Sequence, residues 1–136
     1  MPAHMVLDSF ALLTFLRDEP GSEMVAALLE RAGLRDQPVH MTEVSYAELQ
    51  SFVCRQEDEA AWHAVADDLL AAPIEFHAAD RRLADKAAEL KARFKISLAD
   101  AFAAALAHEK KAELVTGQPE FKALEKEIKI KWLPHG

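Results

Sequence analysis

Met5-Val-Leu-Asp-Ser-Phe-Ala-Leu-Leu13 is the segment that best predicts the architecture, because an apolar run leads through an acid into apolar residues at helical spacing. Residues 5–7 suit a strand that is covered on both faces. Ser9 is expected to cap a following helix, whose buried side would carry Leu12, Leu13 and Leu16. Asp8 therefore falls at a strand-to-helix junction, and open α/β sheets bind ligands beyond the carboxyl ends of their strands. The alternative is that Asp8 is a solvated loop residue or a second helix cap.

Strands and helices alternate along the rest of the chain. Further strands are expected at residues 37–41, 74–76 and 114–116, and an edge strand with outward lysines at residues 128–132. Helices are expected from Ser22 to Gly33, from Thr42 onward, over residues 57–71, 80–94 and 98–110, and briefly near Phe121. Strands that are separated by helices imply a parallel sheet with helices on both faces. We therefore predict an α/β fold in which residues 1–136 form a single domain.

Composition narrows the classes of protein to which the chain can belong. With 136 residues and one cysteine, Cys54, it can bury a core but cannot form an internal disulfide, which fits a reducing compartment. Since no run of about 18 apolar residues occurs, we expect a soluble, cytoplasmic protein with no membrane contact. The net charge of -7 argues against general electrostatic binding to nucleic acid. Arg17, Arg55 and the late lysines form either a local basic rim or solvated surface charge.

Two further acids are expected at the same edge of the sheet as Asp8. Glu48 lies on the second turn of the helix that begins at Thr42, at the margin of its apolar face. Asp100 lies at the start of the helix over residues 98–110, which must run antiparallel to the strand that follows it. Each acid also has a plainer interpretation, since Glu48 can be a surface residue and Asp100 can complete a capping box with Ser97.

The chemistry of three converging carboxylates favours a bound cation. In one crevice they would repel one another and raise one another's pKa unless a cation neutralised them. Oxygen ligands favour Mg²⁺ or Mn²⁺ over zinc, and the six histidines show no His-x-His or His-Glu-x-x-His spacing. Thr116 and Gln118, at the end of a strand, can point an oxygen at the same place. Carboxylate-held Mg²⁺ typically serves phosphoryl chemistry, so these residues indicate a metal-dependent phosphodiesterase or phosphatase.

Several stretches, in their order and spacing, carry a family resemblance. They are Val6–Leu13 with Glu19–Gly21, Met41–Glu48, Leu90–Arg93, Ile96–Ala105 and Leu114–Phe121. Together they resemble the PIN-domain ribonucleases of the VapC toxin type, which occur in bacterial and archaeal toxin-antitoxin pairs. The resemblance implies a three-layer α/β/α sandwich with a central, mostly parallel sheet, and a Mg²⁺ or Mn²⁺ site at which an activated water cuts RNA. It assigns that site to Asp8, Glu48 and Asp100, and it implies a homodimer and a cognate antitoxin that blocks the site.

Two positions depart from the family's pattern. Gln118 stands where a fourth acid is common, which puts a second metal site in doubt, and Phe10 stands where a small polar residue is usual. Thr116 and Gln118 are expected to orient a ligand or water. The alternative function is a PIN-like module that binds RNA or a partner with an incomplete metal site. A flavodoxin-like phospho-acceptor domain ranks last, because no adjacent acidic pair is evident near the first strand.

An antitoxin segment would need an apolar surface next to the acids. A groove around Phe10, Phe15 and the helix over residues 43–52 is the predicted place for it, although these aromatic side chains can equally belong to the core.

Overall fold

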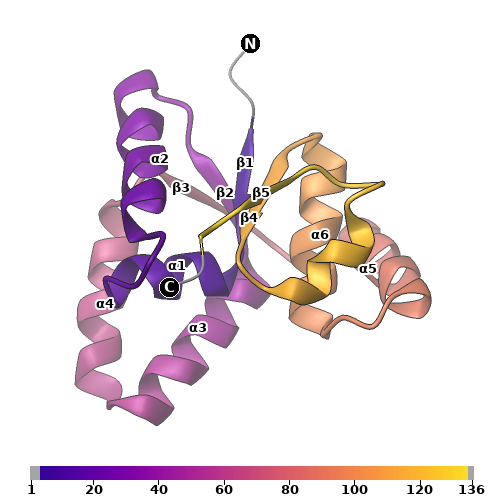
Figure 1. The fold of residues 1–136 in the computed structure, drawn as a ribbon. Helices are drawn as coiled ribbons and strands as arrows, with labels where there is room; N and C mark the ends of the chain where they lie inside the picture. Colours follow the sequence, from indigo (N-terminus) through magenta and orange to yellow (C-terminus); the bar gives the residue numbers. More distant parts are fainter. Residues whose placement is uncertain (1–3, 135–136) are drawn as a thin grey trace.

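A five-stranded parallel sheet forms the centre of the protein in the computed structural model, which describes residues 4–134 (Figure 1). The strands lie in the order β3-β2-β1-β4-β5. Their bounds are β1 Met5–Leu7, β2 Val39–Thr42, β3 Ile74–His77, β4 Glu113–Thr116 and β5 Ile130–Trp132. The α/β prediction is confirmed. Each pairing between these strands is parallel, including that of the edge strand β5 with β4. Of the domain predicted over residues 1–136, residues 1–3 and 135–136 lie outside the described part.

Helices cover both faces of this sheet. Their bounds are α1 Ser9–Leu16, α2 Ser22–Arg35, α3 Glu43–Gln56, α4 Glu59–Ala71, α5 Arg81–Arg93 and α6 Leu98–Lys110, with a short 3-10 helix η1 at Pro119–Leu124. Because successive strand residues point to opposite faces, Val6 and Leu114 pack with α5, α6 and η1, whereas Leu7 and Val115 pack with α1–α4. Figure 1 shows these two groups of helices on either side of the sheet. Within residues 4–134, every helix is too short or too polar to span a bilayer.

Short polar side chains begin most of the helices. Thr42, where a helix was expected to begin, and Ser97, the proposed member of a capping box, are N-caps, since each accepts a hydrogen bond from a backbone N–H three residues ahead. The predicted cap Ser9 is wrong, because Asp8 occupies the N-cap position of α1 and accepts from the N–H of Ala11. The helix predicted to end at Gly33 continues to Arg35, and Asp36 takes the left-handed conformation (φ 52°) that ends it.

Helix α6 lies against the sheet with almost no polar face. Residues 101–107 are all buried, and five of them are alanines, which are small enough for the helix to approach both α5 and the strands closely. Since α6 precedes β4 and the chain reverses between them, the first turn of α6 lies at the carboxyl edge of the sheet. This placement brings Asp100 to the same edge as Asp8.

Candidate functional site

Asp8 is the most enclosed acid at the carboxyl edge of the sheet. It follows β1 directly and is only 2% exposed. Its Oδ1 accepts a hydrogen bond of 2.8 Å from the N–H of Ala11, and its Oδ2 accepts one of 2.5 Å from the hydroxyl of Thr116, at the end of β4. The carboxylate is therefore held by one group from α1 and one from the end of β4.

Asp100 lies beside it on the first turn of α6. Its side chain is buried, with the residue 6% exposed, and its backbone N–H donates to Ser97 Oγ over 3.1 Å. When the amide of Gln118 is oriented so that its nitrogen faces Asp100, Nε2 lies 2.9 Å from Oδ1 and 3.2 Å from Oδ2. The backbone N–H of Gln118 in turn donates to Thr116 Oγ1 over 3.1 Å. Thr116 and Gln118 thus link the two buried acids into one polar network.

Glu48 reaches the same network from α3. Its carboxylate accepts a hydrogen bond from the Ser9 hydroxyl, next to Asp8 in the chain. The sequence placed Glu48 at the margin of the apolar face of its helix, whereas the structure leaves it exposed. The reason is that Glu48 borders an open groove instead of packing under a neighbouring element.

Burial and mutual repulsion dominate the electrostatics of the site. Burial raises the pKa of Asp8 to about 7, against the lowering effect of its bonds from Thr116 and Ala11, and the charges of Asp100 and Glu48 add to the rise. Burial also raises the pKa of Asp100 to about 6, with further contributions from Glu48 and Glu120. Asp100 and Glu48 act on Asp8, and Glu48 acts on Asp100, so the three carboxylates lie close enough to interact. Their role as a shared site stays a prediction.

The donor set fits a hard divalent cation. Its atoms are carboxylate, hydroxyl and amide oxygens, and, within residues 4–134, none of the three carboxylates forms an ion pair with a basic side chain. Uncompensated buried negative charge is costly, so a cation would relieve it. The three acids do not each place an oxygen within 4.8 Å of the other two, so an ion held directly by all three would require at least one side chain to move.

A groove of about 480 Å³ opens beside the acids. Its floor is lined by the apolar side chains Phe10, Leu13 and Phe52, and its rim by the arginines Arg17 and Arg55. Glu48 and Gln118 border the end that lies next to the acids. The guanidinium of Arg17 lies 5.5 Å from the centre of the Phe52 ring. The predicted apolar groove is thus present around Phe10 and α3, but Phe15 packs with the core on the α1–α4 side and does not line it.

Gly117 gives the Phe10 ring its place in this groove. A Cβ atom at position 117 would lie 2.5 Å from Phe10 Cε1, a distance at which the ring must move. We expect Gly117→Ala to lower the free energy of unfolding by about 1–3 kcal/mol, through this overpacking. Chemical denaturation measures the loss. Gly117→Ala should cost little further stability when it is made in a Phe10→Ala background, because the clash partner is then gone. A Gly117→Ala protein as stable as the wild type would contradict this packing.

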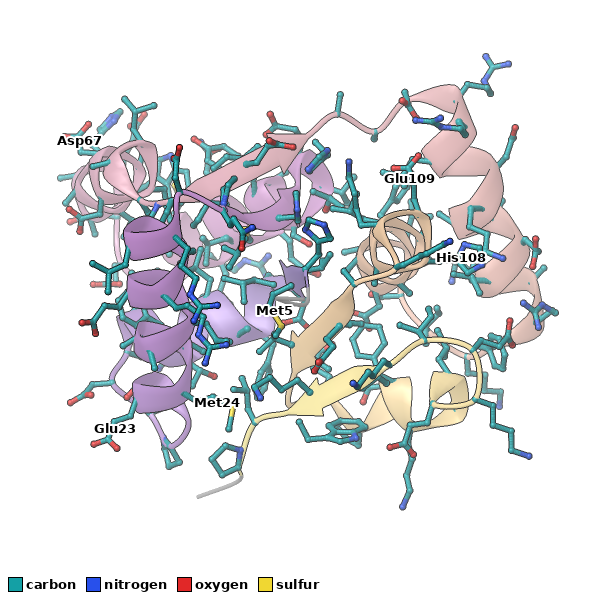
Figure 2. All side chains as sticks on the ribbon, turned by 90° about the horizontal axis from the view of Figure 1, so that it is seen from above. Met5, Glu23, Met24, Asp67, His108 and Glu109 are labelled. Carbon is teal, nitrogen blue, oxygen red and sulfur yellow. The ribbon has the colours of Figure 1, made fainter. Side chains whose placement is uncertain are left out.

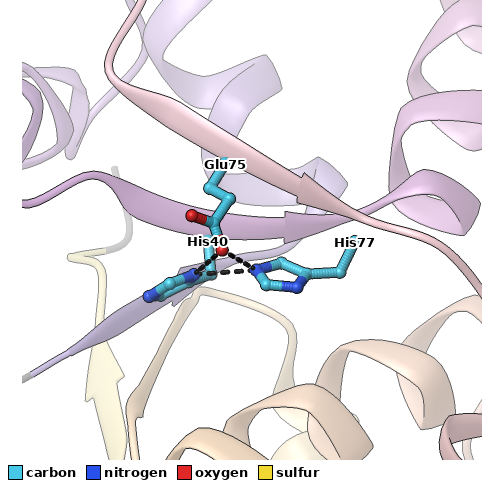
Figure 3. Close-up of side chains that lie close together, drawn as sticks. All are labelled: His40, Glu75 and His77. Carbon is cyan, nitrogen blue, oxygen red and sulfur yellow. Dashed lines mark hydrogen bonds and ion pairs between the residues drawn. The ribbon is translucent and has the colours of Figure 1, made fainter.

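A second cluster of titratable groups lies elsewhere and was missed in the sequence. His40 on β2 and Glu75 and His77 on β3 place one ligand atom each within 4.8 Å of the others (Figure 3). No His-x-His spacing marks this cluster in the sequence, because the two histidines lie on different strands. The available signal was Glu75-Phe-His77, in which the outer side chains share one face of a strand, together with a histidine on a neighbouring strand.

Comparison with known proteins agrees with the fold. The sequence model described as PIN domain matches residues 5–127. The structure of VapBC2 from Rickettsia felis bound to a DNA fragment from their promoter has a TM-score of 0.76 at 18% sequence identity, covering 96% of this chain and 98% of that chain. FitAcB from Neisseria gonorrhoeae gives a TM-score of 0.67 at 22% identity, covering 93% and 95%. VapC20 from Mycobacterium tuberculosis, a toxin that cleaves the sarcin-ricin loop, gives 0.68 at 17% identity, covering 88% and 94%. No curated protein sequence matches the chain significantly.

Proposed function

Since the chain belongs to the PIN domain family, we propose that it is a metal-dependent endoribonuclease and the toxin of a toxin-antitoxin pair. The observation that carries the proposal is the pair of buried acids, Asp8 and Asp100, at the carboxyl edge of the sheet, whose pKa values are raised by burial and by the charges of neighbouring acids. A fold that keeps two such groups buried, without a basic partner, stores electrostatic repulsion that a divalent cation relieves.

Asp8, Glu48 and Asp100 would hold Mg²⁺ or Mn²⁺. When bound, the cation would lower the pKa of an attacking water and stabilise the leaving oxygen of an RNA phosphodiester. The Thr116 hydroxyl and the Ala11 N–H fix the orientation of the Asp8 carboxylate, and the Gln118 amide is placed to orient a ligand or water beside Asp100.

The groove supplies what a nucleic acid would contact. Arg17 and Arg55 offer phosphate contacts at its rim, and the Phe10 and Phe52 rings offer surfaces on which unpaired bases stack. With a net charge of -7 the chain lacks a general affinity for polyanions, so binding would depend on this local surface.

Cleavage of RNA by the purified chain tests the proposal. A total RNA pool is incubated with the protein in Mg²⁺, in Mn²⁺ and in EDTA, and the cut ends are mapped. We expect discrete cuts in the presence of either ion and none in EDTA. Cleavage that persists in EDTA, or the absence of any cleavage in both ions, would overturn the metal-dependent mechanism.

A second candidate function rests on Gln118. Its amide can donate to both oxygens of Asp100, and this contact neutralises part of the charge that a cation would otherwise neutralise. A PIN-like module that binds RNA or a partner, with an incomplete metal site, is consistent with such a contact. Such a module would show no increase in thermal stability with Mg²⁺ or Mn²⁺.

Replacing Gln118 with Glu distinguishes the two functions. In the nuclease, Gln118→Glu adds a charged oxygen ligand, so we expect Mn²⁺ to bind roughly tenfold more tightly and the metal-free protein to lose stability through repulsion of Asp100. Isothermal titration calorimetry and denaturation in EDTA measure the two effects. Gln118→Asn serves as the uncharged control. Unchanged Mn²⁺ affinity in Gln118→Glu would place this side chain outside the metal site.

The same proposal includes an antitoxin and a second copy of the chain as partners. Several of the similar solved structures are toxin-antitoxin complexes, which supports a partner protein of this kind. The groove, apolar on its floor and acidic where Glu48 and Glu19 border it, suits a segment with apolar and basic side chains. Co-expression with the product of the neighbouring reading frame should abolish RNA cleavage, and sedimentation equilibrium of the isolated chain measures the dimer.

A further inference from the structure

We propose that His40, Glu75 and His77 form a second metal site, selective for Zn²⁺ or a similar nitrogen-binding transition-metal ion, which ties the edge strand β3 to β2. The site is separate from the acidic crevice. The proposal rests on the placement of three ligand atoms, on the hydrogen-bonding of His40 and on the ligand chemistry.

Sheet register brings the three side chains together. β2 and β3 pair in parallel, with His40 opposite Glu75 and Thr42 opposite His77. Since residues two apart on a strand share a face, Glu75 and His77 point to the same side of the sheet as His40. Figure 3 shows the three side chains converging there.

The distances between the ligand atoms match those in a tetrahedral zinc site. His40 Nδ1 lies 2.8 Å from His77 Nε2, and Glu75 Oε2 lies 3.1 Å from His77 Nε2 and 3.7 Å from His40 Nδ1. Ligands held about 2.0–2.1 Å from Zn²⁺ in tetrahedral geometry are about 3.3 Å apart. The three observed distances lie on either side of this value, so an ion would require only small rotations of the side chains.

His40 differs from an ordinary buried histidine, because one of its ring nitrogens has no hydrogen-bond partner among the described residues. It is 6% exposed, and its Nε2 has no hydrogen-bond partner within the described part of the chain. Among residues 4–134, the only polar contacts of its side chain are those that Nδ1 makes within the cluster. Burial of an imidazole is costly when one of its nitrogens is unpaired, so a merely structural role leaves this residue unexplained.

The protonation state favours metal binding. Burial lowers the pKa of His40 to about 4 and also lowers that of His77, so both rings are neutral at pH 7 and their nitrogen lone pairs are free to bind. Other groups also act on the cluster: Lys110 and His4 repel a cation, whereas the charges of Glu75 and Glu109 attract one. The carboxylate of Glu75 is about half exposed and can turn toward an ion.

The ligand set separates this site from the acidic crevice. Two imidazole nitrogens and one carboxylate oxygen favour Zn²⁺ over Mg²⁺, and Mn²⁺ is the weakest binder in the transition-metal series at such sites. His40 and His77 lie within the influence of Lys110 at the end of α6, whereas Asp100 lies on its first turn. A rise of 1.5 Å per residue places these two positions about 15 Å apart along the helix. One ion therefore cannot serve both sites.

Zinc titration of the full chain without a histidine tag, pre-treated with chelator, tests the proposal. We expect one Zn²⁺ per chain, an increase in Tm of several degrees, and with Co²⁺ the visible absorption bands of a site with nitrogen ligands. His77→Ala should weaken Zn²⁺ binding by at least about a hundredfold. Glu75→Gln, at a half-exposed position that tolerates the change, should also weaken it.

Two control variants make the outcome decisive. His63 is exposed on α4 and remote from the cluster, so His63→Ala should bind Zn²⁺ as the wild type does. Asp8→Asn should also retain the ion, because its substitution alters only the acidic crevice. Zinc binding that survives both His77→Ala and Glu75→Gln in folded protein, or that is lost in Asp8→Asn, would overturn the proposal. Circular dichroism establishes that each variant is folded.

Discussion

Asp8→Asn is expected to lower the rate of Mn²⁺-dependent RNA cleavage by more than about a hundredfold. Loss of a partner that merely supports a metal ligand costs 10- to 100-fold in affinity or activity, and removal of the ligand's own charge should cost more. Asparagine has nearly the same shape and is an equally good N-cap, so α1 keeps its start. Single-turnover cleavage of a defined RNA measures the effect.

Matched variants separate this effect from a general loss of charge. Asp67 is an exposed acid on α4 at the periphery of the molecule (Figure 2), and Asp67→Asn should cleave like the wild type. Asp100→Asn should be as inactive as Asp8→Asn, and the double variant should be little worse, because residues that act as a unit give non-additive losses. Wild-type cleavage by Asp8→Asn would end the proposed role of this carboxylate.

The same substitution should stabilise the protein when no divalent cation is present. The pKa of Asp8 rises from 3.8 to about 7 on folding, so the folded state binds the proton more tightly than the unfolded state does. Below about pH 4, Asp8 is protonated in both states. As the pH rises from about 4 to 7, the unfolded state loses this proton first, so the free energy of unfolding falls until the folded state is ionised too. At pH 8, ionised Asp8 therefore opposes folding by about 4 kcal/mol, and Asp8→Asn removes that cost.

Urea denaturation in EDTA at pH 5 and pH 8 measures this difference. The wild type should lose free energy of unfolding between the two pH values. Asp8→Asn should lose less, with the remainder due to Asp100, whose pKa of about 6 lies in the same interval. Mn²⁺ should raise the stability of the wild type at pH 8 and have little effect on Asp8→Asn. Parallel pH dependence in the two proteins would show that Asp8 is not protonated in the folded state near neutrality.

The sequence predicts the acidic site because of the directionality of a parallel sheet. Asp8 follows a strand and Asp100 begins a helix that precedes another strand, so both must lie at the carboxyl edge whatever the details of packing. The choice between Asp8 and Ser9 as helix cap depends on where β1 ends, because either side chain can accept the bond. The exposure of Glu48 could not be predicted, since it depends on how far α1 and α3 separate around the groove.

The histidine cluster depends on information that local pattern does not hold. His40 and His77 are neighbours only because β2 and β3 pair in a register that places residue 40 opposite residue 75. A shift of one residue would move both side chains of β3 to the other face of the sheet. The scatter of histidines along the chain was therefore a poor guide to their positions in space.

The hydrogen bond between Asp8 and Thr116 joins residues 108 positions apart and carries a consequence for biosynthesis. A nascent polypeptide still attached to its ribosome lacks Asp100 and Thr116 until most of its codons have been read. Asp8 and Glu48, which are made earlier, lack the third acid until then. Translating ribosomes are rich in RNA, so under the proposed function the order of synthesis keeps them apart from a complete acidic site until the final strands emerge.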